Sequence, residues 1–412
     1  MRSYVLDVET YIDYFLVLFK RVGTDEAIAF EMHEDQELDV DGLSRMMEEN
    51  LTIGFNSNSY DLHMIAGAIN GKTNEELKKI SDAIITSNKP GWMIANRHEC
   101  EIPKKAYGGT LWRHIDIINV APGQASLKIY GGRINAPRMQ DLPIEPSASI
   151  SPAQRDELRE YCLNDLETTE LLYTTLSKQL KLRRDMSKQY KIDLRSKSDA
   201  QIAEAVFRKE IGELDGRQVL PPKHIDRKKR YRYLDPKIIK FRSPELRDTL
   251  KHIIETEFTL TEKASIQLPQ WLAEKKIEIG GSKYQMGIGG LHSTEKKRHI
   301  ICDDDHVLRR PEEARYYQSI VIQQKLIPEN IGKGFVDVYT KIYTTRLEAK
   351  ASGDKTTADS LKISLNGSFG KLGSRFSALY APDLLIQTTI TGQLSLLMLI
   401  EMLEDEGISV VS

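Results

Sequence analysis

The chain has 412 residues, of which 40% are hydrophobic and 29% are charged, and its formal net charge is −2. These proportions are ordinary for a globular protein and exclude a disordered chain, a collagen-like fibre and a disulfide-stapled miniprotein. The three cysteines are far apart and odd in number, so we expect reduced thiols and a cytoplasmic location. No stretch approaches 18 uninterrupted apolar residues and no signal segment opens the chain, so we expect no membrane contact.

Strand and helix patterns alternate along the first part of the chain. Short links join the first three strands, which predicts a meander that leads into strand–helix units, and hence an α/β domain with a mixed sheet over residues 1–180. The patterns are, in order, strands at 4–9, 14–19 and 27–30, a helix from Asp41, a strand at 51–55, a helix after Asp61, a strand at 114–118, and a long helix that Ser151 and Pro152 open.

The middle of the chain is basic. Residues 181–243 contain 19 Lys and Arg against 9 Asp and Glu, a local charge of +10, whereas the rest of the chain carries −12. Such a stretch either holds a polyanion or forms a solvated, salt-bridged surface, and charge alone does not separate the two. Residues 244–275 have a helical pattern. We therefore expect 181–280 to be a basic, mostly helical region.

Glycine-rich turns and helices make up the last part of the chain. Gly280-Gly281 and 287–290 flank a strand. The later patterns are a strand-to-helix transition at 314–324, helices over 335–370 with a break at 352–354, a helix over 392–404 with Gly407 in the C-cap position, and a strand at 408–411.

Four carboxylates form the first candidate site. Asp7 and Glu9 are two apart in a strand and point to one face, Asp61 begins a helix, and Tyr161 and Asp165 are one helical turn apart. Such carboxylates stay ionised together only around cations, and two divalent ions about 4 Å apart would clamp a phosphodiester. In that arrangement the Tyr161 hydroxyl would orient the attacking water.

These segments resemble a known set of motifs. Asp7-Val8-Glu9, residues 56–61 and residues 161–165 are similar to the three exonuclease motifs in the proofreading domain of family-B DNA polymerases, which has an RNase-H-like fold. The resemblance implies two Mg²⁺ or Mn²⁺ ions held by Asp7, Glu9, Asp61 and Asp165. It also implies that the single-stranded 3′ end of DNA contacts Thr10, Asn56 and Tyr60. Lys128 matches no motif, and we give it no role.

A second resemblance covers residues 281–412, and it implies that the basic region 181–280, which lies between the two resemblances, holds DNA. Lys362 to Gly370 are similar to the fingers motif of the same family, which implies that the Lys362 cation binds the incoming deoxynucleoside triphosphate and that Asn366, Gly367 and Phe369 line the new base pair. Arg346, one turn before Lys350, is a further candidate for the phosphates. Upstream, residues 284–293 resemble the glycine-rich entry to the palm of phage polymerases. Gly289 and Gly290 would contact the primer–template duplex, and Tyr317 would face the nucleotide sugar.

The palm pattern is incomplete. Glu312 stands where the family carries a metal-binding Asp, and residues 407–412 resemble the strand that leads into the second catalytic motif. We expect palm at 281–330, fingers at 331–370 and a second, truncated piece of palm at 371–412. Synthesis would then require a second polymerase chain that supplies the missing motif and the thumb. The alternatives are a degenerate polymerase remnant and a non-catalytic DNA-binding subunit.

Overall fold

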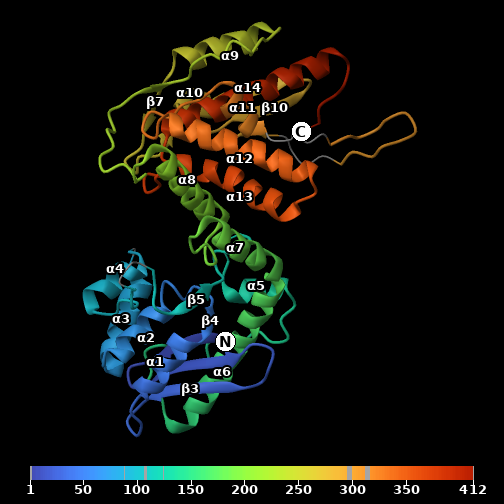
Figure 1. Ribbon diagram of the computed structural model, residues 1–412. Coiled ribbons are helices and arrows are strands. Elements are labelled where there is room, and N and C mark those ends of the chain that lie inside the picture. The colour runs from blue at the N-terminus through green and yellow to red at the C-terminus, as the bar shows by residue number, and fades with distance from the viewer. Residues whose placement is uncertain are drawn as a thin grey trace. The chain divides into compact units, whose positions relative to one another are not determined.

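The chain forms two compact units, residues 1–198 and 199–412, each of which is taken by itself below (Figure 1). The computed structural model describes residues 2–87, 89–105, 109–123, 125–294, 299–310 and 316–411. Glu312, the weak candidate metal ligand, lies outside the described residues. The division falls inside the basic stretch, so residues up to 198 pack with the first unit and the remainder with the second.

Unit 1 contains a five-stranded mixed sheet in the order β3-β2-β1-β4-β5. β1 pairs antiparallel with β2 and β2 with β3, whereas β1 pairs parallel with β4 and β4 with β5. The predicted meander and mixed sheet are therefore confirmed. The strands are β1 (Ser3–Thr10), β2 (Phe15–Arg21), β3 (Ala27–Met32), β4 (Leu51–Gly54) and β5 (Arg113–Asp116).

Helices cover both faces of this sheet. Side chains alternate along β1, so Tyr4, Leu6 and Val8 pack into one core with α1 to α3, while Val5 packs into the other core with α6. Figure 1 shows α6 along the sheet, where it contacts β1 and β2. The helices of unit 1 are α1 (Val40–Glu49), α2 (Asp61–Ile69), α3 (Asn74–Thr86), α4 (Gly91–Ala95), the 3-10 turn Asn96–His98, α5 (Leu127–Arg133), α6 (Pro152–Thr175) and α7 (Ser177–Tyr190).

The start of α6 follows the sequence prediction. Ser151 is the N-cap residue, Pro152 occupies the first turn, and the Ser151 backbone N–H donates to Oε1 of Gln154 at 3.0 Å, as in a capping box. The helix buries Leu158, Cys162 and Leu166 at four-residue spacing against the sheet. This buried stripe fixes the rotation of α6, and therefore the direction in which its polar neighbours point.

Unit 2 is built around α14, whose apolar face forms a core with two three-stranded sheets. The sheets have the orders β6-β7-β8 and β11-β10-β9. The strands are β6 (Tyr231–Arg232), β7 (Glu257–Leu260), β8 (Ile266–Gln267), β9 (Ile277–Ile279), β10 (Ser282–Met286) and β11 (Leu291–Ser293). The helices are α8 (Asp199–Asp215), α9 (Pro244–Glu255), α10 (Gln270–Glu274), α11 (Tyr316–Gln323), α12 (Lys333–Ala351), α13 (Lys355–Leu372) and α14 (Pro382–Asp405).

Four predictions of secondary structure after residue 180 differ from the structure. Within the expected helix at 244–275, α9 ends at Glu255 and β7 and β8 follow, because the alternating Phe258 and Leu260 are the buried side chains. Between 216 and 243 the only regular element is β6, so the region 181–280 is less helical than expected. Residues 408–411 form no strand. α14 also begins ten residues before the predicted start, at Pro382.

α14 is long and apolar enough to cross a membrane, and it is the one such helix among the described residues. Two thirds of its most apolar window, 67%, is buried inside the protein. Leu394 and Leu397 are fully buried, and Ile390 is 1% exposed. This burial is what the core helix of a globular domain shows, because such a helix is apolar on most sides.

Candidate metal centre

The structure brings four carboxylates of unit 1 together. Asp7 and Glu9 share with Val5 the face of β1 that α6 covers, Asp165 lies on α6, and Asp61 is the first residue of α2. The charges of Asp61, Glu9 and Asp165 all act on the Asp7 carboxyl group, and the Asp7 and Asp61 side chains share a hydrogen bond. We call Asp7, Glu9, Asp61 and Asp165 the acidic cluster.

Burial and mutual repulsion disfavour ionisation of the acidic cluster. Although Asp7 and Glu9 keep some solvent contact, desolvation, reinforced by the neighbouring acids, raises the pKa of Asp7 well above its usual range and that of Glu9 to about 8. Desolvation raises the pKa of Asp61 to about 7. In the absence of cations these groups therefore retain protons near neutral pH, where ordinary carboxyl groups have lost them.

The donor set fits divalent cations. Asp61 is 4% exposed, and its Oδ1 atom has no hydrogen-bond partner among the residues that the structure describes. A buried carboxylate oxygen without a partner is costly unless a cation or donor satisfies it. Carboxylate oxygens are the ligands that Mg²⁺ and Mn²⁺ prefer. Asp7, Glu9, Asp61 and Asp165 are therefore the residues that would hold such ions.

Tyr161 and Lys128 complete the surroundings of Asp165. The Tyr161 hydroxyl, in a side chain 8% exposed, is hydrogen-bonded to the Asp165 carboxyl group. Desolvation raises the pKa of Asp165, whereas Tyr161 and the charge of Lys128 lower it. Lys128 lies on α5, and its Nζ donates to Oδ1 of Asp141 at 2.9 Å. The sequence analysis gave Lys128 no role, because α5 reaches α6 only through the folding of the chain.

The loop between β4 and α2 is held by Asp116, which the sequence analysis also missed. Asp116 is 1% exposed, and its Oδ1 accepts from the backbone N–H groups of Asn56 at 3.0 Å and Ile118 at 3.1 Å. Its Oδ2 accepts from the N–H of Asn58 at 2.9 Å. Asn56 has a φ of 61°, a left-handed conformation that such hydrogen bonds help to maintain. Asp116 thereby fixes the loop that delivers Asp61 to the cluster.

His114 supports the same loop from the strand beside it. Its Nε2 lies 2.6 Å from Oγ of Ser57, and its Nδ1 lies 2.8 Å from Oγ1 of Thr52. Burial lowers the pKa of His114 to about 3, so the ring is neutral. A Cβ on Gly54 would lie 2.5 Å from the Ser57 oxygen, which explains the glycine. The sequence does show Asp116 at the end of a predicted strand. It does not show that this strand, β5, pairs with β4, the strand that leads into the loop.

The three residues predicted to contact single-stranded DNA lie in different environments. Asn56 is exposed on the loop. Thr10 is 8% exposed, at the end of β1. The Tyr60 ring packs partly into the core, and its hydroxyl lies 2.7 Å from Oγ of Ser81. The Tyr60 ring therefore keeps only part of its surface for a base, and contact with DNA stays a prediction for all three.

Part of the second candidate set in unit 2 also comes together. The Tyr317 hydroxyl donates to the carbonyl of Gly289 at 3.1 Å, and the Tyr317 ring centroid lies 5.2 Å from that of Phe369. A Cβ on Gly290 would lie 4.0 Å from the same hydroxyl. The side chain of Gln318, the residue after Tyr317, donates to Oδ1 of Asn366 at 2.8 Å. These contacts join the glycine-rich turn, α11 and α13.

The predicted phosphate-binding cations lie on the neighbouring helices α12 and α13. Lys362 is exposed one turn before Asn366 on α13. Arg346 lies on α12, and its Nε is buried without a hydrogen-bond partner among the described residues. Gly367 departs from its expected role at a base pair, because a Cβ there would lie 2.4 Å from the carbonyl oxygen of Asp199. Close packing of α13 against α8 is therefore the physical reason for this glycine.

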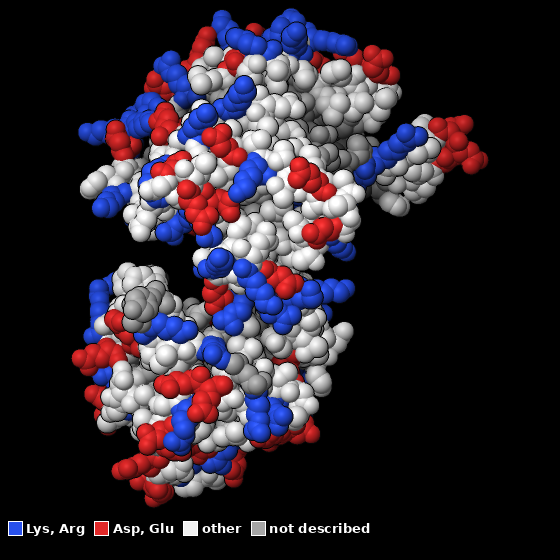
Figure 2. Space-filling view, viewed as in Figure 1, with Lys and Arg blue, Asp and Glu red and all other residues white. Residues whose placement is uncertain are grey.

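The basic stretch is extensively paired with acids. Positive and negative side chains are intermixed over the face that Figure 2 shows. Exposed pairs of this kind contribute little stability, but they reduce the positive charge that a polyanion would meet. Ion pairs within and around the stretch join Lys181 to Asp185, Arg195 to Asp193, Lys209 to Glu213, Arg217 to Asp215, Lys229 to Glu329, Arg232 to Glu257, Lys237 to Asp235 and Arg242 to Asp405.

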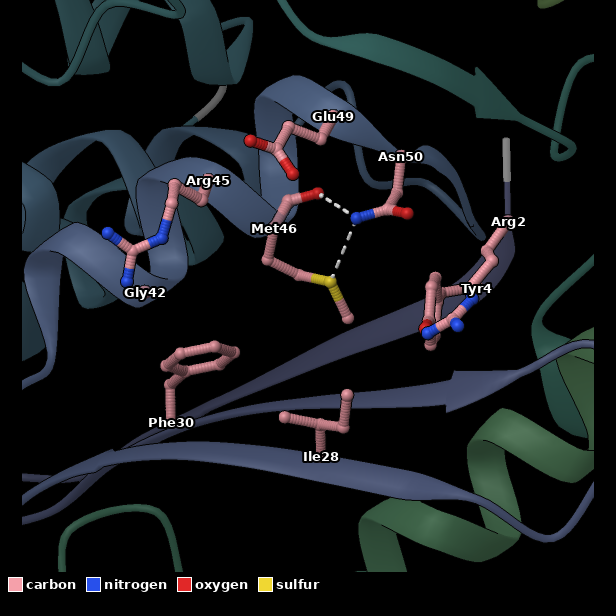
Figure 3. A pocket seen from close by; sticks show the side chains of 9 residues that line it. All are labelled: Arg2, Tyr4, Ile28, Phe30, Gly42, Arg45, Met46, Glu49 and Asn50. Carbon is pink, nitrogen blue, oxygen red and sulfur yellow. Dashed lines mark hydrogen bonds between the residues drawn. The ribbon is translucent and has the colours of Figure 1, made fainter.

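A surface depression of about 520 Å³ lies on the other face of the sheet from the acidic cluster (Figure 3). Tyr4, which alternates with the acids on β1, lines it together with Phe30 and the charged Arg45 and Glu49. Asn50 closes one side by donating to the carbonyl oxygen of Met46 at 3.2 Å. The lining has mixed charge and no carboxylate group of the cluster, so we assign it no part in the chemistry.

No protein-family model matches the chain, and no curated protein matches its sequence.

Proposed function

We propose that unit 1 is a metal-dependent 3′→5′ exodeoxyribonuclease of the kind found in family-B DNA polymerases, with an RNase-H-like fold. Its product would be a deoxynucleoside 5′-monophosphate. The observation that carries the proposal is the gathering of Asp7, Glu9, Asp61 and Asp165 from three separate segments of chain at one place. A purely structural role would not require four acids to repel one another in this way.

Each group around the acidic cluster has a separate role in the proposed reaction. Two divalent ions bound in the cluster would supply Lewis acidity toward the scissile phosphodiester and a nucleophile at neutral pH. The four carboxylates fix the positions of those ions. Tyr161, anchored on Asp165, orients the attacking water through its hydroxyl. Lys128 contributes the positive charge that acts on Asp165 and can offset charge developing on the phosphate.

The loop between β4 and α2 is proposed to receive the 3′ end of the DNA. Asn56 presents its amide to solvent, and Thr10 and Tyr60 lie next to each other beside the acids. Stacking on the Tyr60 ring would tolerate any base, because every base has a flat face. The proposed substrate is therefore single-stranded DNA without sequence preference.

Degradation of 3′-labelled single-stranded DNA tests the proposal. Addition of Mg²⁺ should start the reaction, and the double variant Asp7→Ala, Glu9→Ala should lose at least about a thousandfold in rate, because several kcal/mol of charge stabilisation disappear. The matched control is Asp25→Ala, Glu26→Ala, an exposed acidic pair in the turn between β2 and β3, which should retain full rate. If the Asp7→Ala, Glu9→Ala variant degrades DNA at the unsubstituted rate, unit 1 is not the proposed exonuclease.

For unit 2 we propose binding of a primer–template duplex and of deoxynucleoside triphosphates. The supporting observation is the contact set that joins Tyr317, Gly289 and Asn366 beside Lys362. The test titrates this chain with a fluorescently labelled primer–template duplex in the presence and absence of the complementary deoxynucleoside triphosphate. Tighter binding of the duplex when the triphosphate is present supports the proposal, whereas DNA binding without turnover of either kind would indicate a non-catalytic subunit.

A further inference from the structure

A thiol lies within the acidic cluster. Cys162 is fully buried on α6, one residue after Tyr161, and its thiol donates a weak hydrogen bond to Oδ2 of Asp7 at 3.8 Å. Ligand atoms of Asp7, Glu9 and Cys162 all lie within 4.8 Å of one another. Asp61 adds a buried carboxylate oxygen without a partner among the described residues, from a side chain that is hydrogen-bonded to Asp7.

One of these spacings is close to the sulfur-to-oxygen spacing around a tetrahedral thiophilic ion. With Zn–S near 2.3 Å and Zn–O near 2.1 Å, tetrahedral angles place sulfur and oxygen roughly 3.6 Å apart. The observed 3.8 Å between Cys162 and Asp7 is close to this value. Mg²⁺ makes no use of sulfur, whereas Zn²⁺ and Cd²⁺ bind thiolate strongly. Carboxylates alone would bind both Mg²⁺ and Zn²⁺, whereas the additional thiol favours Zn²⁺.

We propose that Asp7, Glu9 and Cys162, with Asp61 beside them, can hold a single thiophilic cation such as Zn²⁺ within the acidic cluster, and that this cation displaces the Mg²⁺ pair and inhibits unit 1. The inhibition rests on the proposed nuclease function, but the binding does not. As the metal–sulfur bond forms, the thiol releases its proton to solvent, and no electrons are transferred. Burial and the neighbouring carboxylates raise the pKa of Cys162, so the metal-free thiol stays protonated and does not repel the acids.

Cobalt provides a spectroscopic probe that does not depend on activity. The full chain carrying Cys302→Ser, which removes the exposed thiol, is titrated with Co²⁺ in the absence of DNA. A sulfur-to-cobalt charge-transfer band should appear and saturate at one ion per chain, and Zn²⁺ should abolish it by displacement. The band should vanish in Cys162→Ser and persist in Cys100→Ser, a matched control because Cys100 is equally buried but lies in the other core.

The inhibition is measured separately. The Zn²⁺ concentration that halves each variant's own Mg²⁺-supported rate should rise at least about tenfold when Cys162 is replaced by Ser, because a thiolate ligand is lost. If Cys162→Ser fails to fold, X-ray absorption of the Zn²⁺-loaded unsubstituted chain decides the matter by the presence of one sulfur neighbour at about 2.3 Å.

Each result has one meaning. Absence of the band in folded protein, its persistence in Cys162→Ser, or equal Zn²⁺ sensitivity of the two proteins overturns the proposal. A charge-transfer band in a protein that never degrades DNA would leave the thiolate site standing and remove the nuclease assignment. Mg²⁺-dependent degradation of DNA without a charge-transfer band would support the nuclease assignment and exclude the thiolate site.

Discussion

Burial raises the pKa of Glu9 from its usual 4.5 to about 8 and the pKa of Asp61 from its usual 3.8 to about 7. A carboxyl group whose pKa is raised on folding stabilises the folded state below its unfolded pKa, and this contribution is lost as the pH rises through the folded value. When the carboxyl groups of the acidic cluster ionise, their negative charges repel one another and destabilise the folded state. A cation that binds only the folded state would relieve this repulsion.

We therefore expect the metal-free protein to lose stability between about pH 4 and pH 8, by an amount on the order of a few kcal/mol. Denaturant unfolding in the presence of a chelator measures the change. Glu9→Gln removes the ionising group and should flatten the profile, while Glu26→Gln, exposed in the same unit, should leave it as it is. Stability that is constant or rises over this interval would contradict the electrostatic description.

We predict that the Asp116 carboxylate affects the proposed catalysis by holding the loop rather than by touching substrate. Asp116→Asn exchanges one acceptor oxygen for an amide that faces a backbone N–H, so a buried donor loses its partner at a cost on the order of 1–3 kcal/mol. We expect kcat to fall because Asp61 and Asn56 lose their fixed positions. The measured quantities are kcat, KM and the unfolding free energy.

A conservative control separates positioning from stability. Asp39→Asn alters a carboxylate that caps α1 in the same unit by accepting from the N–H of Gly42 at 2.8 Å, far from the loop. It should lower stability by a comparable or smaller amount and leave kcat unchanged. If Asp116→Asn also changes stability alone, the loop is not held for catalysis.

At the scale of elements, α13 contains two glycines with opposite surroundings. A Cβ on Gly367 would lie 2.4 Å from the Asp199 carbonyl oxygen, whereas a Cβ on Gly370 would have its nearest neighbour, Ala200 Cβ, at an ordinary 3.8 Å. Both glycines are inside the helix, where alanine is intrinsically favoured by about 1 kcal/mol. Only the second position has room to gain from it.

Gly367→Ala should therefore destabilise the protein by about 1–3 kcal/mol, because α8 and α13 must separate. Gly370→Ala should be neutral or stabilising by up to about 1 kcal/mol. Thermal unfolding of the two variants side by side measures both effects. Equal effects would mean that the approach of α13 to α8 is not as close as described.

The same elements show what the sequence can and cannot predict. β1 to β4, α1 and α6 were predicted because their apolar residues repeat at clear periods and because Ser151 and Pro152 mark a helix start. The first ten residues of α14 were missed because Thr388, Thr389 and Thr391 are polar and β-branched yet buried, so no apolar face stands out. Tertiary packing overrides propensity there.

The candidate site divides in the same way. Asp7, Glu9, Asp61 and Asp165 were identified because each lies at a fixed offset within a local motif. Asp116, His114 and Lys128 were not, because their contacts depend on which strands and helices become neighbours. Cys162 was read only as a reduced thiol, since nothing in the spacing says that its sulfur faces Asp7.

At the scale of the whole chain, the two units have separate cores. We expect calorimetry to resolve two unfolding transitions, of which Mg²⁺ raises only the one that belongs to unit 1, since ligands stabilise the unit that binds them. Asp7→Asn should abolish the Mg²⁺ shift without moving the other transition. A single cooperative transition that shifts as a whole would show that the units unfold together.

The central position of β1 has a further consequence for folding. β1 is hydrogen-bonded on both sides, with Asp7 opposite Leu18 and Glu9 opposite Leu16 in β2. If β1 were inverted by a one-residue slip, Leu6 and Val8 would turn toward α6, and two carboxylates would be driven into the aliphatic layer beneath α1 and α2. The acids of the cluster thus also oppose misalignment of the strand, so replacing them by leucines would remove a barrier against mispaired, aggregation-prone sheets.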